Sequence, residues 1–197
     1  LAAVIALALR LKRVNTLLSE QQLRDPLTGL YQRPHLFTLS EREVNRAQRH
    51  QRHIAVLIAD LDHCASINSH YGLGAGDLAL KRLAECAQLA VRDFDLIGRY
   101  SGEEVILVLP DTDFKGAMVV AERLRARVKQ QPIKLADGRE FNITVTVGLA
   151  ALNTESETLE DIVVAADQAL HAAKQHGIDR IEVYSELLNR NEEQGEA

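Results

Sequence analysis

The sequence predicts an α/β domain (α+β) with a mixed, mostly antiparallel central sheet flanked by helices. Short apolar runs with strand composition, such as residues 53–59, alternate along the chain with longer segments of helical periodicity. Glycine-containing turns at 101–102 and 137–138 follow strand-like runs, and such turns predict hairpins and hence antiparallel pairing. The chain has 197 residues, which is enough for one domain of ordinary size and an extension.

The composition limits the functions that the chain can have. Its formal net charge of -5 argues against a surface that coats nucleic acid, so we expect no nucleic-acid partner. An anionic ligand would then need a metal ion or a few local cations. The two cysteines, Cys64 and Cys86, fall in segments with interior or helical character, which argues against a disulfide framework and suits a reducing cytoplasm.

Residues 1–24 predict a helix that precedes the domain. Residues 1–9 are apolar and basic residues follow them, which fits the inner end of a transmembrane segment or, alternatively, the start of a buried or amphipathic helix. Positions spaced four and three apart form a narrow seam typical of a two-stranded coiled coil, namely Leu7, Leu11, Val14, Leu18 and Gln21. We therefore expect a homodimer through this helix, with a single helix packed on its own domain as the alternative.

The globular domain begins where Asp25-Pro-Leu-Thr-Gly29 breaks the first helix, and we place its boundaries at 25 and 185. Pro34 suits the first turn of a helix that continues at helical spacing to about residue 50. The almost wholly apolar run 53–59 predicts a central strand buried on both faces. Asp77 then opens a helix over 78–91, and the glycines before it predict a flexible approach to that helix.

The second half of the chain continues the alternation. A hairpin is expected within 94–109, followed by a helix from a cap at 113 to about 131. A second hairpin at 137–138 leads into a strand over 141–148, and a last helix covers about 159–176 before a strand at 181–184 closes the sheet. The acidic tail, 186–197, is expected to be disordered.

Acidic residues gather at the ends of two predicted strands. Asp60-Leu-Asp62 follows the buried run, and Glu103 and Glu104 follow the hairpin turn. Ligands of α/β sheets bind at such ends, and buried carboxylates are costly unless a cation compensates them. A metal held by both clusters is therefore the preferred interpretation, against a capping role for Asp60 and a solvated hairpin tip. Nearby residues of zinc-ligand type lack a fourth ligand at zinc spacing, namely His63, Cys64 and His70.

Taken in order, these motifs resemble the GGDEF family, the diguanylate cyclases, over residues 25–184. The resemblance is carried by Asp25-Pro-Leu-Thr-Gly-Leu30, Asp60-Leu-Asp-His63, Asn68, Gly76-Asp77 and Arg99-Tyr-Ser-Gly-Glu-Glu-Val105. It implies a nucleotidyl-cyclase-like fold and an enzyme that condenses two GTP into cyclic di-GMP and pyrophosphate, with one GTP on each of two facing domains. It also implies an upstream sensor domain, missing from this chain, and a location at the cytoplasmic face of the bacterial inner membrane.

The resemblance implies a metal site and a pair of catalytic carboxylates. Asp60, the carbonyl of Leu61 and Glu103 would hold Mg²⁺ or Mn²⁺ on the phosphates, where the metal neutralises charge as phosphoryl transfer requires. Glu103 and Glu104 would be the catalytic residues.

The resemblance also implies how the nucleotide is held. Asn68 and Asp77 would hydrogen-bond the guanine edge, and a carboxylate that faces two ring N–H donors selects guanine over adenine. Gly102 would let the backbone approach the phosphates, and Lys174 would supply a cation to them.

The chain departs from the family pattern at several positions. Ala65 replaces a phosphate-facing lysine and Ile178 replaces an arginine, so two cations are missing. These losses favour an alternative function, a catalytically weak or silent module that binds GTP or cyclic di-GMP. The other departures are Ser101 and Val105 in the signature hairpin, and Gln32, Pro34, Cys64, Ser69 and Leu73 elsewhere.

Arg92-Asp-Phe-Asp95 lies just upstream of the hairpin and resembles the RxxD inhibitory site of the same family. The resemblance implies that Arg92 and Asp95 bind cyclic di-GMP, with Arg123 contributed by a neighbouring domain. An ordinary ion pair at a helix end is the alternative, and it would contribute less than about 1 kcal/mol. Because a strand separates these residues from the hairpin, we expect a second site, distinct from the one around Glu103.

Overall fold

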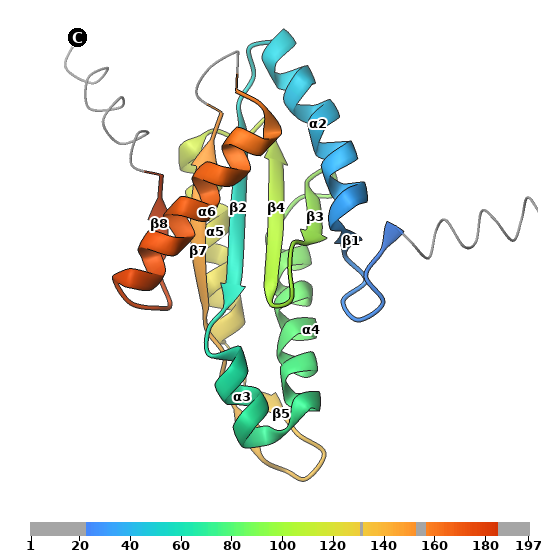
Figure 1. Cartoon of the computed structure of the whole chain (residues 1–197), viewed down its shortest axis with the longest axis vertical. Helices are drawn as coiled ribbons and strands as arrows, with labels where there is room; N and C mark the ends of the chain where they lie inside the picture. The colour runs from blue at the N-terminus through green and yellow to red at the C-terminus, as the bar shows by residue number, and fades with distance from the viewer. Residues whose placement is uncertain (1–22, 131, 153–156, 185–197) are drawn as a thin grey trace, which may run out of the picture.

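The computed structural model describes residues 23–130, 132–152 and 157–184 of the chain. The coiled coil and membrane segment predicted within residues 1–24 fall almost entirely outside these ranges, as does the tail predicted for 186–197. The described elements, in chain order, are β1 Tyr31–Gln32, α2 Arg33–Arg49, β2 Ile54–Leu61, α3 Cys64–Tyr71, α4 Leu73–Ala90, β3 Leu96–Arg99, β4 Glu104–Pro110, α5 Phe114–Lys129, β5 Ile133–Lys134, β6 Glu140–Phe141, β7 Val145–Ala151, α6 Leu159–Gln175 and β8 Ile181–Val183 (Figure 1).

The central sheet has the strand order β1-β3-β4-β2-β7-β8. The strand β2 pairs antiparallel with β4 on one side and with β7 on the other, and β3 pairs antiparallel with β4. The outer pairs, β1 with β3 and β7 with β8, are parallel. This arrangement confirms the predicted α/β class with a mixed, mostly antiparallel sheet. The short strands β5 and β6 form a separate two-stranded ribbon.

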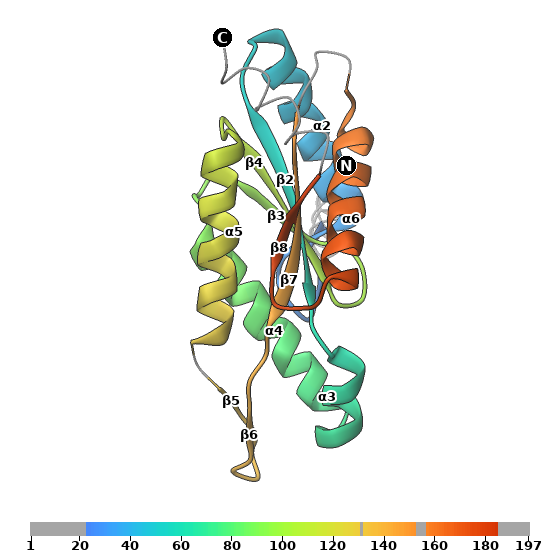
Figure 2. The same cartoon turned by 90° about the vertical axis from the view of Figure 1, so that its left-hand side faces the viewer.

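The helices cover both faces of the sheet. Seen edge-on, α2 and α6 lie on one face and α4 and α5 on the other (Figure 2). Side chains of β2 alternate between the two layers, with Leu57 in the cluster beneath α4 and α5 and Val56 in the cluster beneath α2 and α6. Every residue of β2 is buried, as expected for a central strand covered on both sides.

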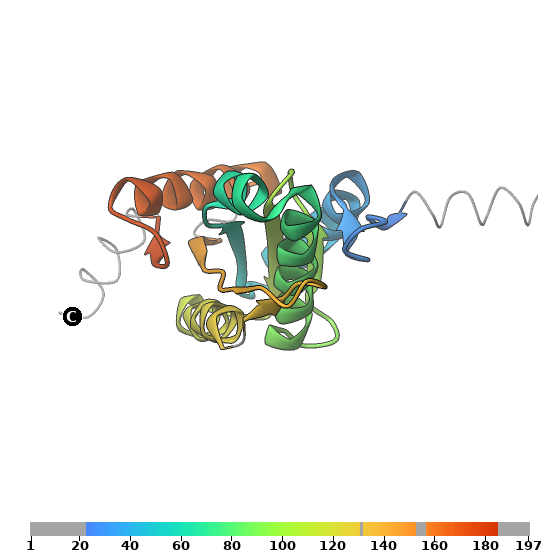
Figure 3. The same ribbon diagram turned by 90° about the horizontal axis from the view of Figure 1, so that it is seen from below.

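The helix α3 and the beginning of α4 lie at the carboxyl end of β2, beyond the edge of the two layers (Figure 3). The sequence predicted a helix over 78–91, whereas α4 begins at Leu73 and includes Gly74 and Gly76. The break between α3 and α4 is confined to Gly72, whose φ of 91° suits glycine. Gly76 permits a close approach, because a Cβ there would lie 2.3 Å from Asn68 Oδ1.

Candidate active site

Asp60 lies near the end of β2, on the sheet face that α6 covers. Its neighbours across the strands are Glu104 of β4 and Thr146 of β7. The Asp60 residue is 4% exposed, and Lys174 Nζ of α6 lies 2.9 Å from its Oδ2 atom. The helix packs this closely because Gly148 has no side chain, and a Cβ there would lie 2.1 Å from the Ala166 carbonyl oxygen. Packing of α6 on the sheet therefore places a cation on Asp60.

The electrostatic state of Asp60 indicates a site that favours positive charge. Burial raises the pKa of Asp60 to about 6; the charges of Glu103 and Glu104 add to this effect, and Lys174 opposes it. Among the described residues, no three His, Cys, Asp or Glu side chains form a ready-made metal site. Carboxylates such as those of Asp60 and Glu103 are donors that hard divalent cations prefer.

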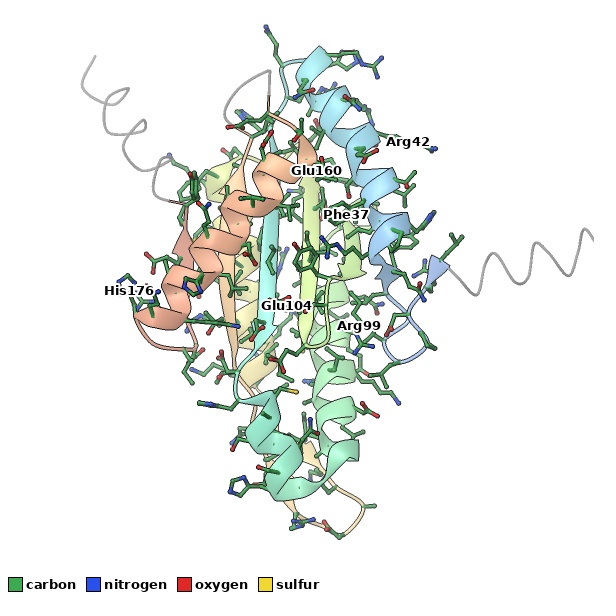
Figure 4. All side chains as sticks on the ribbon, viewed as in Figure 1. Phe37, Arg42, Arg99, Glu104, Glu160 and His176 are labelled. Atoms are coloured by element: carbon green, nitrogen blue, oxygen red, sulfur yellow. The ribbon has the colours of Figure 1, made fainter. Side chains whose placement is uncertain are left out.

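The two glutamates of the hairpin occupy different positions. Glu104, labelled in Figure 4, begins β4, and its carboxylate accepts a hydrogen bond from Ser101 Oγ. Glu103 lies in the exposed turn before the strand. The backbone carbonyl of Glu103 accepts a hydrogen bond of 3.2 Å from the Leu61 N–H. This bond fixes the turn against the end of β2, so both glutamates lie close enough to Asp60 to act on its charge.

Cys64 contacts both Glu103, of the predicted metal site, and Asn68, of the predicted guanine site. Burial raises the pKa of its thiol to about 11, and a hydrogen bond to the Glu103 side chain, with the charges of Glu103, Asp60 and Asp77, adds to the shift. Its Sγ atom lies 3.8 Å from Asn68 Nδ2, which donates to it. Asn68 Oδ1 in turn accepts a hydrogen bond of 3.1 Å from the Gly76 N–H. Cys64 therefore lies between Glu103 of the predicted metal site and Asn68 of the predicted guanine site.

The Asp62 carboxylate is held in a network of hydrogen bonds. It accepts hydrogen bonds of 2.6 Å from both Thr144 Oγ1 and Thr146 Oγ1, and one of 3.1 Å from the Asp179 N–H. These donors belong to the β7 region and to the loop before β8. Asp62 therefore ties the end of β2 to the β7 region and the loop before β8, whereas Asp60 faces the ammonium group of Lys174.

An ion pair that the sequence patterns did not predict supports the hairpin turn between β3 and β4. Arg99 Nη1 lies 2.9 Å from Asp25 Oδ2, and Arg99 Nη2 donates a hydrogen bond of 2.8 Å to the Gly102 carbonyl (Figure 4). Burial acts to raise the pKa of Asp25, but hydrogen bonds from Thr28 and Arg99 outweigh it and hold the pKa below its usual value. Asp25 thereby joins the beginning of the domain to the hairpin turn.

The RxxD residues lie together, away from Asp60. The Arg92 N–H donates a hydrogen bond of 2.8 Å to Asp95 Oδ2, and Asp95 Oδ1 is buried without a hydrogen-bond partner among the described residues. Burial raises the pKa of Asp95, and the charges of Arg92 and Arg123 oppose the shift. Arg123 donates to the Ala90 carbonyl of its own chain. Helix α5 packs on α4, and the charge of Arg123 acts on Asp95 within the same domain; a contribution of Arg123 from a neighbouring domain stays a prediction.

Comparison with known proteins identifies the family. The family model described as diguanylate cyclase, GGDEF domain, matches residues 22–180. The chain belongs to the GGDEF family. It is 33% identical over 184 residues to diguanylate cyclase A of Treponema denticola, covering 92% of this chain and 48% of that protein. It is 37% identical over 164 residues to diguanylate cyclase DgcP of Pseudomonas aeruginosa, covering 83% of this chain and 24% of that protein. The chain thus spans about half or less of the length of these relatives.

Solved GGDEF structures agree with the fold. Diguanylate cyclase SiaD of Pseudomonas aeruginosa, solved with its activator SiaC, superposes with a TM-score of 0.78 at 31% identity, covering 92% of this chain and 70% of that one. The coiled coil and GGDEF domain of DgcB from Caulobacter crescentus, solved with c-di-GMP, gives a TM-score of 0.87 at 23% identity, covering 92% and 96%. At that identity DgcB supports the fold alone. None of the helices that the structure describes is long and apolar enough to cross a membrane.

Proposed function

We propose that the chain is the catalytic domain of a diguanylate cyclase, which condenses two GTP into cyclic di-GMP and pyrophosphate. The observation that carries the proposal is the acidic end of β2, where the buried Asp60 pairs with Lys174 and the turn that carries Glu103 is hydrogen-bonded to the Leu61 N–H. Family membership adds that curated relatives of this chain are named diguanylate cyclases.

Asp60, Glu103 and the Leu61 carbonyl are the donors that would hold Mg²⁺ or Mn²⁺ in the proposed site. The ion, when bound, neutralises phosphate charge and orients the triphosphate. Lys174, which pairs with Asp60 in this structure, is then free to contact a phosphate oxygen. Glu104 is the carboxylate that we assign to the proton of the attacking ribose hydroxyl. In place of the lysine that the family has at position 65, the first backbone N–H groups of α3, including that of Ala65, would donate to the phosphates.

Replacing Asp77 with alanine is expected to weaken binding of a non-reactive GTP analogue about tenfold or more, because a buried guanine N–H pair would lose its acceptor. Calorimetry with Mg²⁺ present measures the change, and binding of the matching ATP analogue should stay equally poor. Glu85→Ala is the matched control, since Glu85 is an exposed acid on the same helix. Unchanged affinity for the GTP analogue in Asp77→Ala would remove Asp77 from the guanine site.

We propose that the domain works as a homodimer assembled through residues 1–24 and controlled by an upstream sensor domain. The condensation needs two half-sites to meet, and a shared helix raises their effective concentration. Deleting residues 1–24 should therefore lower specific activity at low protein concentration, and the activity should climb as concentration rises. A truncated chain whose specific activity matches that of the parent at every concentration would contradict pairing by this helix. We also propose that the domain lies at the cytoplasmic face of the bacterial inner membrane, because basic residues follow the apolar run 1–9.

We propose that Arg92 and Asp95 form an inhibitory site for cyclic di-GMP. Asp95 Oδ1 is an acceptor without a partner in the described structure, which suits the N–H donors of guanine. Arg123 lies beside it, so two domains could be joined by product through this face and their active sites held apart. Arg92→Ala should raise the product concentration needed to halve the rate by about tenfold or more. If product still halves the rate at the parental concentration, an ordinary capping interaction is the correct interpretation.

The alternative function is a GGDEF module that binds GTP or cyclic di-GMP without turnover. It is favoured by one observation, the absence of cationic side chains at Ala65 and Ile178, which are both exposed. A domain that binds nucleotide but does not neutralise the triphosphate could pass a signal through contacts alone.

A further inference from the structure

The serine at position 101 places a side-chain donor in the hairpin turn between β3 and β4. The φ angle of Ser101 lies outside the left-handed region, so this position accepts a residue with a side chain. The turn itself is closed by backbone groups, because the Tyr100 and Ser101 N–H groups both donate to the Glu104 carbonyl, over 2.8 and 3.4 Å. The hydroxyl of Ser101 is therefore not needed to form the turn and is free to act on another group.

The group on which this hydroxyl acts is the carboxylate of Glu104, which is labelled in Figure 4. Ser101 Oγ donates to Glu104 Oε2, whereas Glu104 Oε1 accepts no hydrogen bond from the residues that the structure describes. Each oxygen of an ionised carboxylate can accept a hydrogen bond. Glu104 is only half-buried, so one of its oxygens is held by the turn and the other stays available to a ligand.

Glu104 lies directly opposite Asp60 on the neighbouring strand. Opposite residues of an antiparallel pair share one face of the sheet, and like charges in this position repel each other. Each carboxylate has a donor of its own, because Asp60 pairs with Lys174 Nζ at 2.9 Å and Glu104 bonds to Ser101. Lys174 belongs to α6, which packs on β7 and β2, whereas Ser101 lies in the turn on the β3 side of β4. The two donors therefore hold the two carboxylates from different sides.

We propose that Ser101 is a positioning residue of this chain, whose hydroxyl holds Glu104 apart from Asp60 and Lys174 and presents its free oxygen to the attacking ribose hydroxyl. Without this hydroxyl, the ammonium group of Lys174 attracts both carboxylates and draws Glu104 away from the ribose. The inference rests on the proposed cyclase activity. It assigns to Ser101 a role that a glycine at this position would lack.

Steady-state kinetics of cyclic di-GMP formation by the full chain test the inference. Ser101→Ala should lower kcat about tenfold or more, because a general base that is displaced from its substrate loses much of its contribution. The KM for GTP should stay within about twofold of the parental value, since Ser101 acts through a group that is used only in the transition state. Ser101→Thr keeps the hydroxyl and should recover most of the rate, whereas Ser101→Gly should behave as Ser101→Ala. Thr38→Ala is the matched control, because it removes an exposed hydroxyl of α2 that donates to the Pro34 carbonyl.

A double-mutant cycle separates positioning from a purely structural role. In the Glu104→Gln background, adding Ser101→Ala should change the residual rate by less than about twofold, because a positioning residue acts only through the carboxylate that is already lost. Thermal unfolding of Ser101→Ala should match that of the parent, since the backbone bonds that close the turn remain. Losses that multiply in the double variant would overturn the inference.

The outcomes also separate this inference from the function on which it rests. If the parent turns GTP over and Ser101→Ala works at the parental kcat or faster, the role of Ser101 is wrong and the cyclase activity stands. If the parent forms no cyclic di-GMP, the proposed activity is wrong and this inference falls with it.

Discussion

Replacing Glu103 with glutamine is expected to reduce the initial rate of cyclic di-GMP formation about a hundredfold or more while the fold is kept. Glutamine preserves the volume of the side chain in an exposed turn, and the backbone carbonyl that receives the Leu61 N–H is unchanged. The lost charge is one of those that make the Asp60 site favourable to a cation. A divalent ion contributes several kcal/mol to the phosphoryl-transfer transition state, and each 1.36 kcal/mol is worth about tenfold in rate.

The rate should be measured with saturating GTP and excess Mg²⁺, with product separated by chromatography. Glu160→Gln is the matched control, because Glu160 lies in the first turn of α6 at the opposite end of the sheet (Figure 4). It should keep the parental rate, and thermal unfolding should show that both variants remain folded. Full activity in Glu103→Gln would exclude this carboxylate from the mechanism.

Replacing Asp62 with alanine is expected to have the largest effect on stability among the site's acidic residues. Removing the buried carboxylate leaves the hydroxyls of Thr144 and Thr146 without their acceptor, while the Asp179 N–H keeps Thr146 Oγ1 as its acceptor. Unsatisfied buried donors cost about 1–3 kcal/mol each, so the loss of the two threonine hydrogen bonds costs about 2–6 kcal/mol. For a domain of this size we expect the Tm to fall by about 10 °C.

Asp62→Asn separates the hydrogen-bond network from the charge. Asparagine keeps one carbonyl acceptor, and its amide can donate to a rotated threonine hydroxyl, so its Tm should fall by less than that of Asp62→Ala. Calorimetry or circular dichroism measures both transitions. If Asp62→Ala melts at the parental Tm, the network does not hold β2, β7 and the loop before β8 together.

The elements that sequence patterns predicted correctly are those whose signals are local. The buried run before Asp60 became β2, and the turn at Ser101-Gly102 became the hairpin of β3 and β4. Both depend on strand composition and turn chemistry, which neighbouring residues largely determine. The start of α4 was predicted too late because glycine lowers helix propensity, whereas contact with Asn68 selects a glycine at 76.

The contacts that were not predicted join residues far apart in the chain. The pair of Asp25 and Arg99 spans 74 positions, and no spacing rule indicates which arginine meets which aspartate. Lys174 was expected on a phosphate, and the close packing of α6 on Gly148 places it on Asp60. The RxxD string named Arg92 and Asp95, but only the folded chain shows that Arg24 lines a cleft with them.

Turnover of GTP by the purified chain is the most direct test of a catalytic domain built around Asp60, Glu103 and Glu104. Incubation with GTP and Mg²⁺, followed by mass spectrometry, should show cyclic di-GMP together with two pyrophosphates for each product molecule. A chelator should stop the reaction, and ATP should give no cyclic product. A chain that binds GTP but forms no cyclic di-GMP at any protein concentration would contradict the proposed activity and establish the silent module in its place.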